Sequence, residues 1–149
     1  MMNKKLTLQI LEEAKEIHIE LMYVIEDFFE GELKDVPISI DEAESDFREI
    51  FYAHKEDIYH ILGAQFYKKL DELHAQWHLQ YEKIDKILLA KKRVGFFSKF
   101  FVKHKISTSD YQLAKGYYHE LSAITGEILY LLNASIRRVV ALSDSKFES

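Results

Sequence analysis

Residues that interrupt helices are scarce in this chain. It contains one proline, Pro37, and five glycines among 149 residues. Because proline and glycine interrupt regular backbone more strongly than other residues, their scarcity favours long helices joined by few turns. No segment alternates apolar and polar residues in the way that a half-buried strand does. The sequence therefore predicts an all-α fold.

Apolar residues recur at spacings of three and four, the pattern of a helix with one buried face. They place four helices at about 6–30, 40–62, 64–92 and 109–142. An unbroken helix from 40 to 93 would be about 80 Å long, which exceeds a small domain, so a break is expected between Tyr52 and Gln65. Four amphipathic helices with short connections predict a single-domain antiparallel four-helix bundle with a basic aromatic connection before the last helix.

Several helix boundaries carry local signals. Ser39-Ile40-Asp41-Glu42 matches a capping box for the second helix, and Gly63 is an expected stop. The polar stretch STSD at 107–110 is an expected cap for the last helix. Within that helix, Gly116 and Gly126 each cost about 1 kcal/mol relative to alanine. The final residues, SDSKFES, are expected to fray.

The bulk composition excludes several classes of protein. Cysteine is absent, which rules out disulfides and thiolate ligands and fits a reducing compartment. The first apolar stretch ends at Glu12 and Glu13, too early for a signal peptide, and no run of 18 apolar residues exists. A net charge of −5 argues against a nucleic-acid binder, which is normally basic over a broad face. We therefore expect a cytoplasmic protein with no nucleic-acid partner.

Signatures of catalysis are missing from the sequence. It has no nucleophile elbow, no phosphate-binding glycine loop and no HExxH zinc motif. Many carboxylates are present, but no pair of them stands out as an acid and base. We therefore expect a protein that is not an enzyme.

Two of the seven histidines have the spacing of metal ligands. His74 and His78 lie four residues apart, and Glu82 follows four later, so all three share one helical face. Two imidazoles at that spacing can bind one metal ion. His18 adjoins the apolar Leu21 and is expected to face the interior, as is His74. A histidine in a bundle core needs a hydrogen bond or a metal, and both outcomes remain open at this point.

The order of these residues resembles the chemoreceptor zinc-binding domain, a cytoplasmic four-helix bundle found with bacterial chemoreceptors and diguanylate cyclases. His18-Ile19-Glu20-Leu21 matches the family's first block, His-x-x-aromatic or leucine. After 23 residues, 45–50 occupy the position of its Cys-x-apolar-Gly-x-aromatic block, and after 23 more, His74-Ala75-Gln76-Trp77-His78 matches its His-x-x-x-His block. The resemblance implies zinc binding by His18, His74 and His78, and a role in chemotaxis or related signal transduction.

The sequence departs from the family pattern at two positions. Ser45 stands at the position of the family's cysteine and Arg48 at that of its glycine. Serine is a poor zinc ligand compared with a thiolate, so the family's cysteine-based response to oxidants is excluded. The fourth ligand is then missing, or is replaced by water or by one of three carboxylates: Asp46, Glu49 and Glu82.

Other metal-binding bundles fit less well. A haemerythrin-like site would need carboxylates at positions that Ile58 and Ile124 occupy, after His54 and His119. A ferritin-like site needs Glu-x-x-His, whereas the chain has aspartate in both Asp-x-x-His stretches, at 57–60 and 71–74. For Asp71 we expect either a solvated surface charge or a hydrogen-bond partner of His74.

A basic and aromatic segment precedes the last helix. Residues 91–105 read KKRVGFFSKFFVKHK and include six Lys and Arg. This segment predicts contact with a protein partner or a second copy of the chain, or with an anionic membrane surface; the alternative is a loop whose phenylalanines cap the bundle. In an adaptor-like or immunity-type interaction protein, the binding surface would be this segment or the acidic first two helices, and the histidines would be structural. The candidate contact residues are Lys91, Lys92, Arg93, Phe96, Phe97, Phe100 and Phe101.

Overall fold

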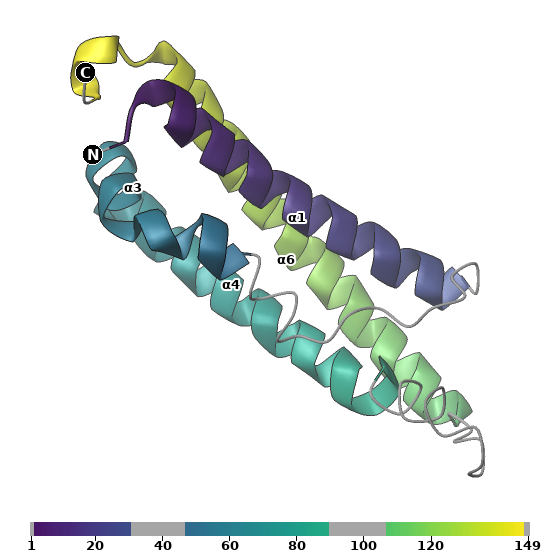
Figure 1. Ribbon diagram of the computed structural model, residues 1–149. Helices are drawn as coiled ribbons and strands as arrows, with labels where there is room; N and C mark the ends of the chain where they lie inside the picture. Colours follow the sequence, from purple (N-terminus) through teal and green to yellow (C-terminus); the bar gives the residue numbers. More distant parts are fainter. Residues whose placement is uncertain (1, 31–46, 90–106, 148–149) are drawn as a thin grey trace.

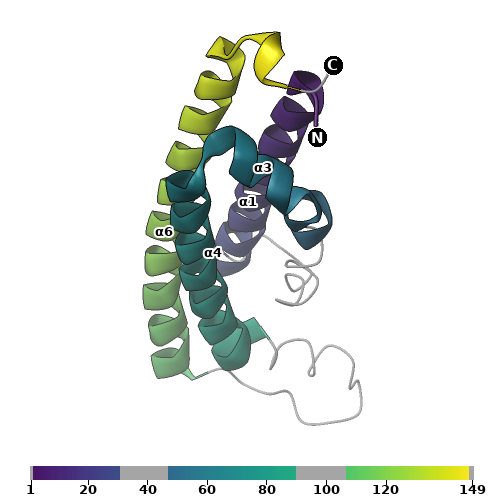
Figure 2. The same ribbon diagram turned by 90° about the vertical axis from the view of Figure 1, so that its left-hand side faces the viewer.

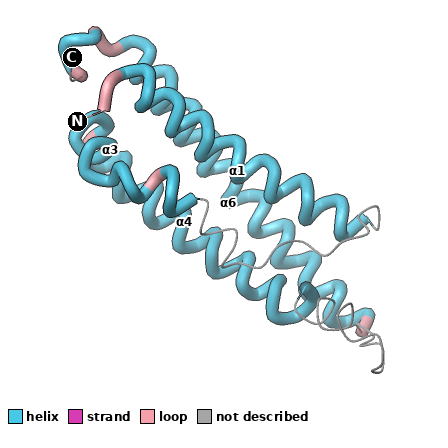
Figure 3. The backbone as a smooth tube through the Cα atoms, viewed as in Figure 1, coloured by secondary structure: helices cyan, strands magenta, loops and turns pink. Residues whose placement is uncertain are grey.

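The computed structural model describes residues 2–30, 47–89 and 107–147, and this part of the chain is helical without any strand (Figures 1 and 3). The all-α prediction is therefore confirmed. The described ranges include four α-helices with both ends defined: α1 (Lys4–Glu30), α3 (Lys55–Leu62), α4 (Ala64–Ile84) and α6 (Thr108–Ala141). Three shorter elements join or extend them: the 3-10 turns η1 (Tyr52–His54) and η3 (Asp144–Lys146), and the π-helical turn η2 (Asp85–Leu89).

Helices α1 and α6 pack against each other and run antiparallel (Figure 1). At the start of α1, the ammonium group of Lys4 donates to the carbonyl oxygens of Val140 at 2.9 Å and Leu142 at 2.8 Å, at the end of α6. At the other end, the hydroxyl of Tyr111 donates to the carbonyl oxygen of Phe29. These contacts also satisfy carbonyls at helix ends that have no partner within the helix.

Helix α4 also packs against α6 in the opposite direction. Near its start, the Arg138 guanidinium donates to the carbonyl oxygen of Leu62 at 3.3 Å. Near its end, the Lys83 ammonium lies 5.1 Å from the ring centroid of Tyr117. Because α1 and α4 both run opposite to α6, they are parallel to each other.

The described residues between α1 and α4, 47–63, do not form one continuous helix. Residues 47–50 are helical, a turn follows at Phe51, and α3 begins only after η1. The sequence predicted a break between Tyr52 and Gln65, which is confirmed, but a helix running through to 62 is wrong. No glycine or proline lies at 51–54; the turn is held instead by the Tyr52 hydroxyl, which donates to Asp71 of α4 at 2.9 Å. The predicted start of this helix, at 40–46, lies outside the described residues.

The predicted apolar stripes form one hydrophobic core. Its largest fully buried side chains include Trp77, Tyr81, Phe47 and Phe51. The C-terminal tail joins this core, since Phe147 is only 7 % exposed, so the prediction of a frayed tail is wrong. Both termini lie at the same end of the molecule (Figures 1 and 2).

The cap predicted for the last helix is present. The Ser107 side chain accepts a hydrogen bond from the backbone N–H of Asp110 at 3.0 Å, which satisfies one of the unpaired donors at the start of α6. The capping box at 39–42 lies outside the described residues. No helix in the described ranges has both the length and the apolar character needed to cross a bilayer.

Gly63 separates α3 from α4 with a backbone conformation that other residues rarely adopt, φ 92° and ψ 164°. We expect Gly63→Ala to lower the free energy of unfolding by about 1–3 kcal/mol because of backbone strain. Gly116→Ala is the matched control: Gly116 is helical with no atom within 4 Å of an added Cβ, so its replacement should stabilise by up to about 1 kcal/mol. Urea unfolding followed by circular dichroism measures both; equal stability of Gly63→Ala and wild type would contradict this account.

Candidate histidine centre

Two of the predicted ligands meet inside the protein. His18 of α1 is 1 % exposed and His74 of α4 is 6 % exposed, and their ring centroids lie 5.7 Å apart with the planes at 83°. Each occupies the buried stripe of its helix, His18 one turn after Ala14 and His74 one turn after Leu70. The prediction that both face the interior is confirmed.

Aromatic side chains wall this pair. Phe47 stacks on His74 with centroids 4.1 Å apart and contacts the edge of His18 at 5.1 Å. Trp77 lies 5.3 Å from His18 and stacks against His74 at 6.0 Å. The imidazoles therefore lie in an apolar, close-packed environment in which polar interactions are stronger than in water.

One hydrogen bond fixes the orientation of the His18 ring. Its Nδ1 lies 2.8 Å from the carbonyl oxygen of Ala14, one turn earlier in α1. A carbonyl oxygen only accepts, so Nδ1 carries the proton, and in the neutral imidazole Nε2 holds the lone pair. Histidines that ligate metals are commonly oriented in this way, with the second ring nitrogen bonded to a backbone carbonyl.

The Trp77 ring is fixed by a residue that the sequence analysis missed. Its indole N–H donates to the Thr125 hydroxyl of α6 at 3.0 Å, and that hydroxyl donates to the carbonyl oxygen of Leu121 at 2.8 Å. Thr125 is 3 % exposed. A threonine four residues after Leu121, within an otherwise apolar stripe, was the available signal. This chain of bonds connects the histidine centre to α6.

His78 and Glu82 lie outside the buried pair. The His78 side chain is 36 % exposed, and its Nε2 is 3.9 Å from a Glu82 carboxylate oxygen. The other oxygen of Glu82 lies 2.7 Å from the Lys86 ammonium. The hydrogen bond from Lys86, and then its charge, lower the pKa of Glu82, with a smaller contribution from His78. Glu82 is therefore paired with Lys86 rather than directed at the histidine pair.

Of the other proposed ligands, only Glu49 can be placed, and it is not at the centre. Glu49 is exposed, and Ser45 and Asp46 lie outside the described residues, as does the basic aromatic segment with its contact residues at 91–101. Within the described ranges, no three His, Asp or Glu side chains form a group able to hold a metal ion. Of the three histidines predicted to be ligands, His18 and His74 therefore meet in the interior, and His78 lies at the edge of the core, partly exposed.

A surface depression of about 430 Å³ opens beside the pair. His74 is among its lining residues, so this member of the pair is reached from the surface. Asp71 also lines the depression; it is exposed and accepts the hydrogen bond from Tyr52 described above, which fits the expectation of a surface charge. The depression is lined by Arg48, Tyr52, Asp71, His74, Ala75 and His78.

Comparisons of the chain with protein-family models, with curated proteins and with solved structures gave no match.

We expect Thr125→Val to remove the acceptor of the Trp77 N–H while keeping the shape of the side chain. A buried donor left without an acceptor costs about 1–3 kcal/mol, so the free energy of unfolding should fall by that amount. Because Trp77 is the sole tryptophan, a change in its fluorescence emission reports on the same site.

The control is Ser135→Ala, at a buried position of the same helix whose hydroxyl donates to the Leu131 carbonyl. It should cost less than about 1 kcal/mol and leave the Trp77 emission unchanged. An unaltered emission spectrum and stability in Thr125→Val would refute the role assigned to this hydrogen bond.

Proposed function

We propose that this protein is a non-enzymatic regulatory module that binds zinc at the histidine centre, in the manner of a chemoreceptor zinc-binding domain. The observation that carries the proposal is the pairing of two buried imidazoles from different helices, one of them held by its Nδ1–H on a backbone carbonyl. We further propose that the segment around 40–50 completes an antiparallel four-helix bundle, and that the protein acts in the bacterial cytoplasm.

The separation of the two rings supports a shared ion. Two imidazoles bound tetrahedrally to one zinc, at Zn–N distances of roughly 2.0–2.1 Å, hold their ring centroids about 5 Å apart. The rings of His18 and His74 are at 5.7 Å. A small movement would therefore bring Nε2 of His18 and a ring nitrogen of His74 to one ion.

His78 is the third ligand in this proposal. It lies one turn beyond His74 on α4, and its contact with Glu82 is long at 3.9 Å. A change of side-chain rotamer at a half-exposed position costs little compared with forming a metal bond. Zinc sites with three protein ligands leave the fourth position to water or to an incoming ligand, and the depression beside His74 gives that access.

The regulatory consequence follows from linkage. An ion that bridges His18 and His74 joins α1 to α4, which otherwise meet mainly through α6. Binding to the folded state alone stabilises it by about 2.7 kcal/mol at a free ligand concentration of 100 Kd. The packing of these helices would then depend on zinc, and a change in packing is a signal that a partner can detect.

A second candidate function is an interaction protein in which the histidines are structural. It is favoured by the stacking of His74 between Phe47 and Trp77, and by the lack of a three-ligand group in the described ranges. In that case the basic aromatic segment at 91–101 provides the contact with a protein partner or a membrane surface. The two candidates differ in whether zinc binds.

We expect untagged protein to bind one zinc ion per chain, and both His18→Ala and His74→Ala to weaken that binding by more than about 100-fold, since even the loss of a partner outside the ligand shell costs roughly 10–100-fold. Isothermal titration calorimetry and elemental analysis measure the affinity and the stoichiometry. Exposed His119 on α6 supplies the control, His119→Ala, which should bind as wild type.

His74→Phe separates metal loss from unfolding, because it keeps an aromatic ring for stacking on Phe47 and Trp77. This variant should remain helical by circular dichroism and bind no zinc. Wild-type protein that is folded and metal-free at micromolar zinc would reject the zinc-binding module and support the second candidate.

A further inference from the structure

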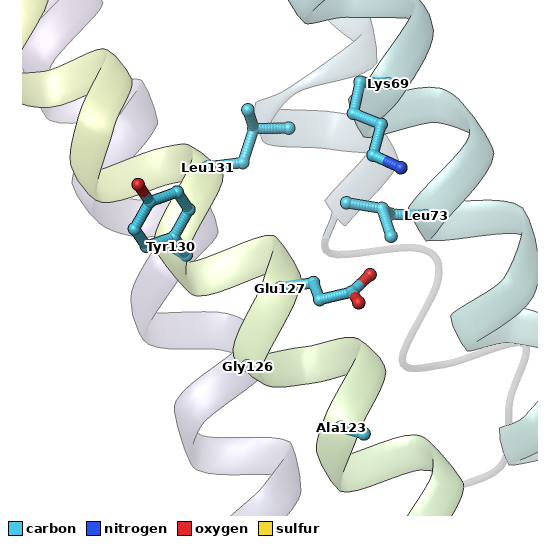
Figure 4. Close-up of a pocket in the computed structure, with 7 residues that line it drawn as sticks. All are labelled: Lys69, Leu73, Ala123, Gly126, Glu127, Tyr130 and Leu131. Atoms are coloured by element: carbon cyan, nitrogen blue, oxygen red, sulfur yellow. The ribbon is translucent and has the colours of Figure 1, made fainter.

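A groove runs between α4 and α6 (Figure 4). Its volume is about 480 Å³, and its floor and walls are mainly apolar, with one charged side chain from each helix. None of its residues belongs to the histidine centre. The groove is lined by Lys69, Leu73, Ala123, Gly126, Glu127, Tyr130 and Leu131.

Gly126 keeps the groove open at a cost to helix stability. It is exposed in the middle of α6, and a Cβ built there meets no atom within 4 Å. Glycine weakens a helix relative to alanine, and nothing in the described part of the chain approaches closely enough to require it. A side chain at this position would narrow the groove, so its absence favours a partner that approaches from outside.

The charges on the two walls have opposite signs. Lys69 extends into the groove from α4, and Glu127 extends into it from α6 (Figure 4). Consider two copies related by a two-fold axis that runs along the length of the groove. The α4 wall of one copy then faces the α6 wall of the other. This symmetry therefore places Lys69 of one copy opposite Glu127 of the other, and does so twice. A surface of this kind is complementary in charge to itself.

Tyr130 adds apolar surface at the same place. It lines the groove and is 73 % exposed, more than any other large hydrophobic side chain in the described part of the chain. Tyrosine is enriched in protein interfaces because its ring buries apolar area while its hydroxyl keeps a polar contact.

We propose that the α4–α6 groove is a self-association surface, on which two copies of the chain pack about a two-fold axis through the groove. The dimer is held by the apolar lining of the groove and by two reciprocal contacts between Lys69 and Glu127. It does not depend on zinc, so it stands or falls separately from the proposed function.

The test is a charge exchange read by analytical ultracentrifugation of the full chain over a range of concentrations. Wild type should show a concentration-dependent dimer. Lys69→Glu and Glu127→Lys should each raise the dimer dissociation constant by at least about tenfold, because both reciprocal contacts become repulsive. An equimolar mixture of the two variants should form a heterodimer, since every contact in it pairs glutamate with lysine; native mass spectrometry distinguishes it from the homodimers.

A second pair of variants tests the groove itself. Gly126→Gln should abolish the dimer while the helical content is kept, since its side chain enters open space in the monomer. Gly116→Gln is the matched control, also in α6 with no atom near an added Cβ, and should dimerise as wild type. Monomeric wild type at all concentrations, a mixture that stays monomeric, or a Gly126→Gln variant that dimerises normally would each overturn the proposal.

Discussion

The burial of the His18 imidazole is the constraint on which the arrangement of this protein depends. A polar ring that is 1 % exposed requires a hydrogen-bond partner, and the carbonyl oxygen of Ala14 supplies one on the same helix. That bond fixes the ring plane and directs Nε2 away from α1. Phe47 and Trp77 pack against the edges of the ring, so the segment at 47 and helix α4 are both positioned by a side chain of α1.

Helix α6 is the common support of the other two long helices. It contacts α1 and α4 along their lengths, and the hydrogen bond from Trp77 to Thr125 joins it to the wall of the histidine centre. Packing on this third helix therefore helps to set the distance between His18 and His74, together with the direct contacts of His18 with His74 and Trp77. Such an arrangement lets an ion that binds the pair alter how α1 and α4 are held together.

Periodicity and local signals predicted the features that a single helix determines. The inward orientation of His18 and His74 follows from their place in apolar stripes, and the Ser107 cap follows from residues three positions apart. Features that depend on contacts between helices were not predictable. The break at 51–54 is held by the bond from Tyr52 to Asp71, and the role of Thr125 depends on Trp77, 48 residues away.

The spacing of four residues between His74 and His78 also shows that a pattern on one helix does not predict contacts between helices. It places both rings on one side of α4, but the side spans the boundary between core and solvent, so one ring is buried and the other is half-exposed. A sequence pattern shows which residues share a helical face, but the neighbouring helices determine which part of that face is buried.

The most direct measurement of whether His18 and His74 share a zinc ion is nitrogen-15 NMR of the imidazole rings during a zinc titration. The account predicts His18 protonated at Nδ1 without zinc, and large ring-nitrogen shifts of His18 and His74 that are complete at one equivalent. Unchanged His18 and His74 resonances at one equivalent, with shifts confined to exposed histidines, would contradict it.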